Sequence, residues 1–244
     1  MPQTTLDAPA GPLPAYLASP EGAGPWPGAV VVQEALGMSD DLRAQADRLA
    51  GAGYLAIVPD LYGRGGTRIG CMVSAFRQLG ARSGAVFDDI GAARAFLAAF
   101  PDCTGRIGLV GFSLGGSLGL ICAARPGFAA ASINYAQVPK DAPVLLTGSC
   151  PIVASYGGRD RLFASMPGKL SEALDGAGVP HDVKVYPEAG HSFMSRGGGA
   201  AYSVIKALSS TSSRIGYHAE AAQDSWRRIL AFFGEHLEKD SEPG

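Results

Sequence analysis

The stretch Arg106-Ile107-Gly108-Leu109-Val110-Gly111-Phe112-Ser113-Leu114-Gly115-Gly116-Ser117-Leu118 decides the fold of this chain. Its apolar residues 107–110 predict a buried parallel strand, and a helix of small residues is expected over 114–124. Between them stands Gly-x-Ser-x-Gly, the pattern of a nucleophile elbow, a strained strand-to-helix turn that exposes a serine hydroxyl. Gly111 and Gly115 suit such a turn because they have no Cβ to clash with neighbouring backbone.

The motif alone is weak evidence, because the chain has 34 glycines in 244 residues. The same letters also fit a glycine-rich helix start with a serine at its amino end. The strand before the motif and the helix after it favour the elbow, since an elbow requires both. The rest of the chain has to decide between the two interpretations.

Composition limits the classes of function. With 47% hydrophobic residues, the chain can bury a large core, and a net charge of −2 excludes a basic surface for nucleic acid or an anionic membrane. The four cysteines form no C-x-x-C pair and have no metal-ligand spacing with the four histidines. We therefore expect reduced thiols, no metal and no cofactor.

Neither a signal peptide nor a membrane span is expected. Residues 1–14 have no basic segment followed by an apolar one, and no apolar run has the length of a span. We expect a cytoplasmic protein, either monomer or homodimer, whose partner is a small-molecule substrate.

Apolar runs and helical patterns alternate along the chain. Strands are expected at residues 29–33, 54–58, 107–110, 129–135, 151–156 and 182–186. Helices are expected at residues 40–51, 86–100, 114–124, 167–177 and 217–237. This alternation with short connections predicts an α/β fold, a mostly parallel doubly wound sheet with helices on both faces.

The remaining segments are less informative. Residues 2–27 predict an edge hairpin or an extended arm, and residues 71–82 are uncertain between loop and short helix. No repeat or linker divides the chain, which predicts a single domain over 1–244, with 1–12 and 239–244 poorly ordered.

A serine hydroxyl needs a histidine base oriented by a carboxylate. In α/β-hydrolases, whose serine stands on such an elbow, the chain order is Ser, then Asp or Glu, then His. Asp160 follows the strand expected at 151–156, and His191 follows the one at 182–186. The carboxyl ends of parallel strands meet at one edge of a sheet, where Ser113 also lies. The sequence therefore predicts that Ser113, Asp160 and His191 act together.

Each partner has rivals, and Asp160 in Gly-Gly-x-Asp could also be a turn-forming aspartate. The rivals stand at the amino end of a strand, within a helix or beside His191: His181, His218, His236, Asp175 and Glu188. For the oxyanion hole, the N–H of Leu114 is expected to be one donor, because it follows the nucleophile at a helix start. Ala35, in the turn 34–37 after an early strand, is expected to supply the other.

Five motifs occur in order: Val-Val-Gln-Glu-Ala-Leu-Gly at 31–37, the segment 54–62 with its ending Pro-Asp-Leu-Tyr, the elbow at 111–116, Gly-Arg-Asp at 158–160 and Ala-Gly-His-Ser-Phe at 189–193. Together they resemble the dienelactone hydrolase family. The resemblance runs from about residue 12 to 238. It implies an α/β-hydrolase fold with a minimal lid, and it places Ser113, Asp160 and His191 at the family's triad positions.

One departure concerns the nucleophile, which is cysteine in the dienelactone hydrolases proper and Ser113 here. In those enzymes the glutamate matching Glu34 interacts with the resting thiol and helps to activate it. A serine relies on His191 as base instead. Glu34 is then a relic, a hydrogen-bonding partner of Ser113, a substrate-site acid or a solvent-facing turn residue.

A second departure concerns the arginines that bind the substrate carboxylate in the family. Arg196 lies within one position of one of them, which makes it a candidate substrate contact. The loop after Tyr62 is shorter here, so that Arg64, Arg68 and Arg77 cannot be matched to the other. For each of these arginines, a solvated surface position is an equal alternative.

Together these features predict a serine carboxylesterase that cleaves small esters or lactones through an acyl-enzyme. The short connection 136–149 leaves little lid over the site, and the loop 192–216 is expected to form one wall. A thioesterase or peptidase on the same scaffold is an alternative, because acyl transfer is shared. A non-catalytic ligand-binding protein is another, because a fold does not fix a function.

Overall fold

The computed structural model describes residues 3–197, 202–203, 207 and 214–238. Within these residues, eight strands form one sheet in the order β1-β2-β4-β3-β5-β6-β7-β8. The strands are β1 (Gln3–Leu6), β2 (Leu13–Ala18), β3 (Trp26–Val32), β4 (Leu55–Pro59), β5 (Cys103–Phe112), β6 (Ala130–Asn134), β7 (Ile152–Gly157) and β8 (His181–Tyr186). From β4 through β3 and on to β8, every neighbouring pair is parallel, as the alternating pattern predicts.

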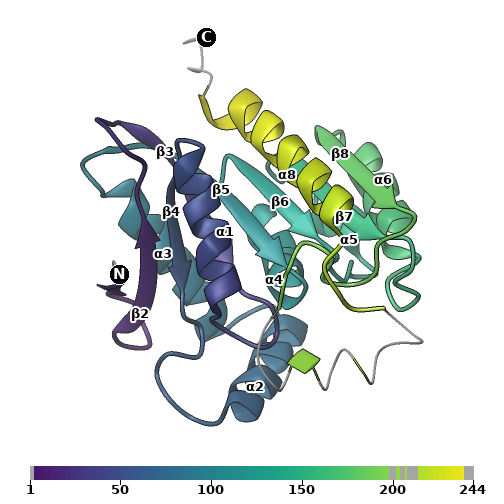
Figure 1. Cartoon of the computed structure of the whole chain (residues 1–244), viewed down its shortest axis with the longest axis horizontal. Coiled ribbons are helices and arrows are strands. Elements are labelled where there is room, and N and C mark those ends of the chain that lie inside the picture. Colours follow the sequence, from purple (N-terminus) through teal and green to yellow (C-terminus); the bar gives the residue numbers. More distant parts are fainter. Residues whose placement is uncertain (1–2, 198–201, 204–206, 208–213, 239–244) are drawn as a thin grey trace.

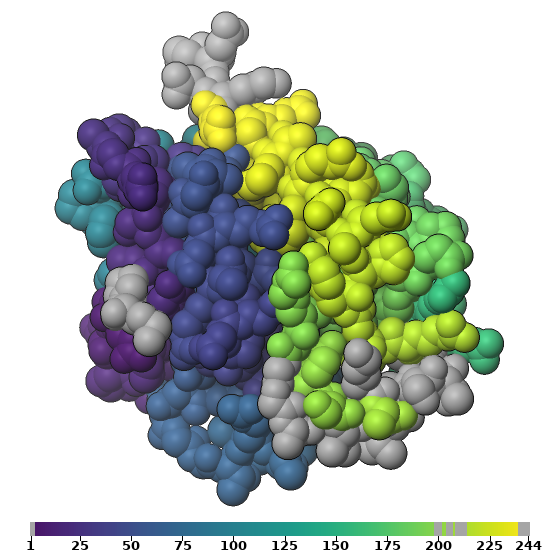
Figure 2. All heavy atoms as spheres, viewed as in Figure 1, coloured from purple at the N-terminus to yellow at the C-terminus, as the bar shows by residue number. Residues whose placement is uncertain are grey.

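Helices cover both faces of this sheet (Figure 1). They are α1 (Asp40–Gly51), α2 (Arg68–Ala81), α3 (Ala85–Ala98), α4 (Leu114–Ala123), α5 (Ala142–Leu145), α6 (Met166–Ala177) and α8 (Ala219–Phe233). One core packs α1 and α8 on the sheet, and the other packs α3, α4 and α6 on the opposite face. The face viewed in Figure 2 is covered largely by α1, in blue, and α8, in yellow. The predicted doubly wound α/β fold is confirmed.

The N-terminal segment is more ordered than the sequence suggested. β1 pairs antiparallel with β2, and β2 pairs antiparallel with β4, which makes the hairpin alternative correct. The expectation of poor order over 1–12 is therefore wrong for residues 3–12, because Leu6 and Leu13 are buried at 1% and 0% exposure and anchor the hairpin to the core. Residues 1–2 and 239–244 lie outside the described residues.

Two helices differ from their predicted ranges. α2 is a full helix that begins after Thr67, whose hydroxyl accepts from the N–H of Gly70. Of its 14 residues only Ala75 is buried, and its apolar residues Ile69, Val73 and Phe76 are 71%, 50% and 48% exposed, so its apolar face does not pack on the core. The terminal helix, predicted at 217–237, begins at Ala219, with His218 as the N-cap of α8. After Phe233 it continues as a π-helical turn, Gly234–Glu238.

The central strands explain why the chemistry gathers at one edge. All residues of β4 and β6, and the later residues of β3 and β5, are buried on both faces of the sheet. Their carboxyl ends face the same edge, where the connecting loops are free to carry polar side chains. None of the helices in the described residues is long and apolar enough to cross a membrane.

Candidate active site

The elbow is built as the Gly-x-Ser-x-Gly pattern predicts. Ser113 joins β5 to α4 with φ 52° and ψ −112°, a strained conformation for a residue with a side chain, and its N–H donates to Asn134 O at 3.0 Å. A Cβ on Gly111 would lie 2.3 Å from the carbonyl oxygen of Gly115, and one on Gly115 would lie 2.3 Å from that of Val32. Both glycines are therefore required by backbone packing around the serine.

Three side chains from three loops form one hydrogen-bonded chain. Ser113 Oγ lies 2.9 Å from His191 Nε2, and His191 Nδ1 lies 2.6 Å from Asp160 Oδ2. Because the buried carboxylate can only accept, Nδ1 carries the proton and Nε2 is left to accept from the serine hydroxyl. Asp160 is 1% exposed and His191 8%. The structure thus brings together the three residues that the sequence singled out.

Backbone contacts hold the loops of Asp160 and His191 side by side. A Cβ on Gly157 would lie 2.3 Å from Gly190 O, and Arg159 N donates to Ala189 O at 2.9 Å. Glu188, the rival acid beside His191, forms an ion pair with Arg159 on the surface. The glycines before Asp160 therefore allow the two loops to pack closely, and the ion pair of Glu188 with Arg159 joins the same loops at the surface.

The other rivals lie elsewhere. His181 is the first residue of β8, at the amino end of the strand, with its Nδ1 2.9 Å from Val179 O. Asp175 approaches His181 at 3.7 Å. His218 caps α8 and His236 packs on Phe232, with ring centroids 4.3 Å apart. Both are half-buried rather than freely exposed surface residues.

Two aromatic rings that the sequence analysis missed enclose the imidazole of His191. The ring of Phe163 stacks on it at 4.9 Å and 26°, and the ring of Tyr135 meets it edge-on at 5.1 Å and 64°. Tyr135 directly follows β6 at the edge that carries Ser113, and that position was a usable signal. Phe163 follows Asp160 by three residues in a loop, where no pattern marks it.

Glu34 lies beside this group. Its Oε1 accepts from Tyr135 OH at 3.0 Å, and Ser192 donates a second hydrogen bond to its carboxyl. Burial raises the pKa of Glu34, although the neighbouring His191 and the two hydrogen bonds act in the opposite direction. The interpretation of Glu34 as a solvent-facing turn residue is therefore wrong. Among the described residues, Ser113 Oγ is hydrogen-bonded to His191 and not to Glu34.

The two expected oxyanion donors lie at neighbouring positions. Leu114 is the first residue of α4, where amide groups have no partner within the helix. Ala35 lies in the turn after β3, which Gly37 N closes by donating to Glu34 O at 3.0 Å, and Ala35 O accepts from Tyr62 OH at 3.1 Å. The close contact of Gly115 with the end of β3 brings these segments together. The role of the two N–H groups stays a prediction.

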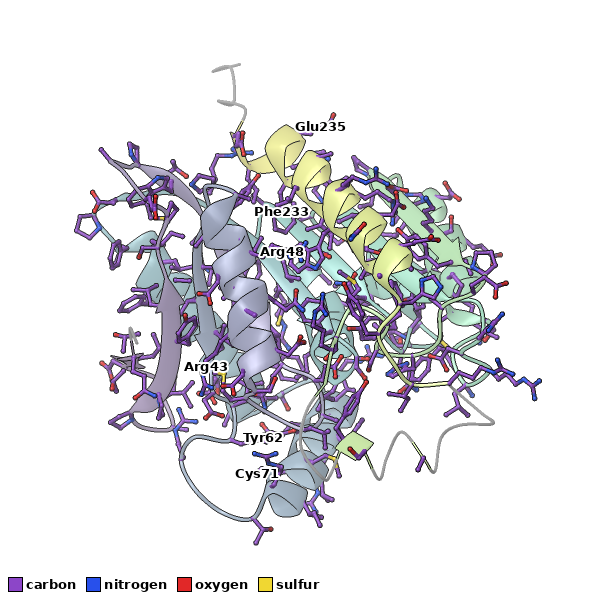
Figure 3. All side chains as sticks on the ribbon, viewed as in Figure 1. Arg43, Arg48, Tyr62, Cys71, Phe233 and Glu235 are labelled. Carbon is purple, nitrogen blue, oxygen red and sulfur yellow. The ribbon has the colours of Figure 1, made fainter. Side chains whose placement is uncertain are left out.

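A cavity of about 130 Å³ opens next to Glu34 and Tyr135. Its walls include the start of α1, Arg68 from α2, and Met194, Ser195, Gly197 and Tyr202. The described part of the loop 192–216 thus forms one wall, and the rest of that loop lies outside the described residues. A wider hollow of about 360 Å³ adjoins it, lined by Tyr62 and by Cys71 of α2, both of which Figure 3 labels.

Of the four arginines considered, Arg68 alone lines either hollow. The guanidinium of Arg64 is paired with Asp89 at 2.7 Å, and Arg77 is exposed on α2. Arg196 stacks on the ring of Tyr217 at 4.3 Å, while its neighbours Ser195 and Gly197 line the smaller cavity. Within the described residues, no cluster of three His, Cys, Asp or Glu side chains is arranged to hold a metal ion.

The chain is similar to known proteins over most of its length. Residues 13–237 match the model of the "Dienelactone hydrolase family". The chain is 32% identical over 243 residues to a protein of Methylorubrum extorquens strain AM1 named "Putative carboxymethylenebutenolidase", covering 93% of this chain and 78% of that one. It is 31% identical over 189 residues to the carboxymethylenebutenolidase of Pseudomonas putida, covering 73% and 79%.

A solved structure gives the same result. The crystal structure described as "Putative Dienelactone Hydrolase" from Klebsiella pneumoniae superposes with a TM-score of 0.77 at 28% identity, covering 96% of this chain and 98% of that one. The likeness therefore extends over nearly the whole length of both chains, and no large insertion separates the elbow from the loops that carry its partners.

Proposed function

The chain belongs to the dienelactone hydrolase family, and from that premise we propose that Ser113, His191 and Asp160 form a catalytic triad that hydrolyses small carboxylic esters or lactones. The observation that carries the proposal is the continuous hydrogen-bonded chain, 2.9 Å from Ser113 Oγ to His191 Nε2 and 2.6 Å from Nδ1 to Asp160. A hydroxyl with a base in contact and an acid orienting that base is the arrangement that acyl transfer needs.

In the proposed reaction, Ser113 Oγ attacks the ester carbonyl while His191 Nε2 takes the hydroxyl proton. The negative charge on the carbonyl oxygen is bound by the N–H groups of Leu114 and Ala35. The tetrahedral intermediate collapses, the alkoxide leaves with the proton from His191, and an acyl-serine remains. Water then gives a proton to His191 and attacks the acyl carbon. The bond from that carbon to Ser113 Oγ breaks, His191 returns the proton to Oγ, and the acid is released.

Glu34 has a supporting role in this proposal. Its carboxyl bonds Tyr135, which contacts the imidazole, and Ser192, which is next to His191 in the chain. Burial raises the pKa of the Glu34 carboxyl, whose Oε1 accepts the hydrogen bond from Tyr135. Glu34 therefore helps to hold the histidine loop, while His191 is the base.

The relatives' names suggest lactones among the substrates, since two of them are carboxymethylenebutenolidases by name. For a substrate that carries a carboxylate, Arg68 is the proposed contact, because it lines both the cavity beside Glu34 and the adjoining hollow, and it forms no ion pair within the described residues. Arg196 is a weaker candidate, since its guanidinium already stacks on Tyr217.

A fluorophosphonate probe and an ester panel test the proposal. We expect the probe to label Ser113 in the folded protein, and we expect hydrolysis of p-nitrophenyl acetate and of a dienelactone. Ser113→Ala should abolish labelling and lower kcat by about 10⁴-fold or more. Absence of labelling, or kcat unchanged in Ser113→Ala, refutes the serine mechanism. Hydrolysis of the simple ester without the dienelactone would retain the mechanism and exclude the lactone.

A further inference from the structure

A separate hollow lies on the other side of the elbow, between α2 and α4. This α2–α4 groove has a volume of about 230 Å³. Its apolar walls are Phe76 and Leu79 from α2, Ile121 from α4, and Pro139 from the segment after β6. The volume is below the roughly 300–1,000 Å³ typical of sites for whole drug-sized ligands, so the groove suits one part of a substrate.

The groove begins close to the nucleophile. Ser117, which lines it, stands one helical turn after Ser113, and Ile121 stands two turns after it, with about 5.4 Å per turn. Ser117 Oγ donates to Ser113 O at 3.2 Å and accepts from Gln137 N at 2.9 Å. The hydroxyl of Ser117 is thus already hydrogen-bonded, and the apolar lining at Ile121 lies one further turn along α4 from it.

The charge inside the groove is neutralised. Arg82 is the charged residue among its lining, and its guanidinium makes a two-bond ion pair with Asp141, one of the bonds being 2.7 Å from Nη1 to Oδ2. The carbonyl of Arg82 accepts from Arg125 at 2.6 Å. No unpaired charge therefore attracts an ionic group into this hollow, and its exposed surface favours an apolar one.

Phe76 gives the groove an unusual wall. Its side chain is 48% exposed, on a helix that buries only Ala75. A ring that is half in water gains free energy when an apolar ligand group covers it. The exposed ring, the paired arginine and the proximity to Ser113 are independent observations that point to the same kind of ligand.

We propose that the α2–α4 groove binds the apolar group of the ester substrate, an alkyl or aryl group linked to the carbonyl that Ser113 attacks. This inference rests on the proposed ester hydrolysis and adds the class of substrate: esters with a short apolar chain or ring. The group belongs to the acyl or to the alcohol side of the ester, and two series of substrates distinguish these sides.

The acyl series is p-nitrophenyl acetate, butyrate and hexanoate, and the alcohol series is ethyl, butyl and hexyl acetate. We expect kcat/KM to rise about tenfold from the shortest to the longest member of one series. One added methylene in a well-packed apolar pocket is worth at least about tenfold, but the Phe76 wall of this groove is exposed, so we expect the whole series to gain only about that much. Phe76→Ala should reduce that ratio about threefold, and Phe76→Lys should reduce it further.

Val73 provides the matched control. It lies on the same helix, is 50% exposed and is outside the lining of the groove. Val73→Ala and Val73→Lys should leave the ratio and the hydrolysis of every ester unchanged. The groove is excluded if neither series depends on chain length, or if the Val73 variants change the ratio as much as the Phe76 variants. No hydrolysis of p-nitrophenyl acetate overturns the proposed function itself, and the subsite with it.

Discussion

Asp160→Asn separates a catalytic role of the triad from a structural one. The carboxylate of Asp160 lies 2.6 Å from His191 Nδ1, and both side chains are buried. An amide of nearly the same shape can place its NH₂ group at that position and donate to Nδ1. The proton of the imidazole then moves to Nε2, which faces Ser113 at 2.9 Å and can no longer accept from the hydroxyl.

The magnitude follows from what is lost. Without an accepting Nε2 the serine has no base, and the imidazolium formed in the transition state has no carboxylate to stabilise it. Changes of this kind cost about 10⁴-fold in kcat in other serine hydrolases, which is about 5.4 kcal/mol in activation free energy. We expect kcat for p-nitrophenyl acetate to fall by about 10³- to 10⁴-fold, while KM changes little.

The assay is steady-state hydrolysis of that ester, together with thermal unfolding of each variant. Asp175→Asn is the matched control, since Asp175 is a surface aspartate of α6 that approaches the other histidine, His181, at 3.7 Å. It should retain full activity. A fall of less than tenfold in Asp160→Asn, with folding intact, would refute the role assigned to the acid. An equal fall in Asp175→Asn would point to a general loss of stability instead.

Further predictions concern the packing around the site. Glu34→Gln should remove a pH dependence of stability, because burial raises the pKa of Glu34 in the folded protein above 4.5. The wild type should therefore lose stability relative to the variant as pH rises from about 4.5 through the raised pKa, as measured by urea unfolding between pH 4 and 8. A difference in unfolding free energy between the two proteins that stays constant with pH would contradict the burial of Glu34. Gly115→Ala places a Cβ 2.3 Å from Val32 O and should lower the free energy of unfolding by about 4 kcal/mol or more, whereas Gly91→Ala, inside α3 with nothing within 4 Å, should raise it by about 0.5–1 kcal/mol. Phe163→Ala removes the ring stacked on His191 and should lower kcat about three- to tenfold, with an unchanged Tm for this half-buried loop residue. A variant with full kcat would show that the ring of Phe163 is not needed to hold the imidazole.

The sequence predicted the parts of the site that depend on topology. Asp160 and His191 could be placed because each follows a buried strand, and parallel strands present their carboxyl ends at one edge. The rings of Phe163 and Tyr135 could not be placed on His191 in the same way. Their contacts depend on side-chain directions across three loops, and the positive φ of 40° at Tyr135 leaves no mark in the sequence.

The same reasoning explains the errors at the N-terminus and in α2. Gln3–Leu6 is a short strand in a segment rich in proline and glycine, and its order depends on Leu6 reaching a core formed by distant residues. α2 carries Ile69, Val73 and Phe76 at helical spacing, but these residues are 71%, 50% and 48% exposed, and only Ala75 of the helix is buried. A local apolar pattern therefore does not show whether the face that carries it packs on the core.

That weak anchoring has a functional consequence. The proposed catalytic groups stand on the edge of a sheet whose central strands are buried on both faces, and the glycines of the elbow tolerate no Cβ. The surfaces around them are different, because α2 supplies Arg68 to both hollows beside Glu34, and Phe76 and Leu79 to the α2–α4 groove, while burying only Ala75. Substitutions on the outer positions of α2 should then change which ester is preferred at little cost in stability, whereas substitutions at the elbow should remove both stability and activity. In the proposed mechanism, specificity and chemistry are thus carried by parts of the chain with different tolerance to change, so that the chain can keep the proposed serine mechanism while preferring a different ester from its relatives.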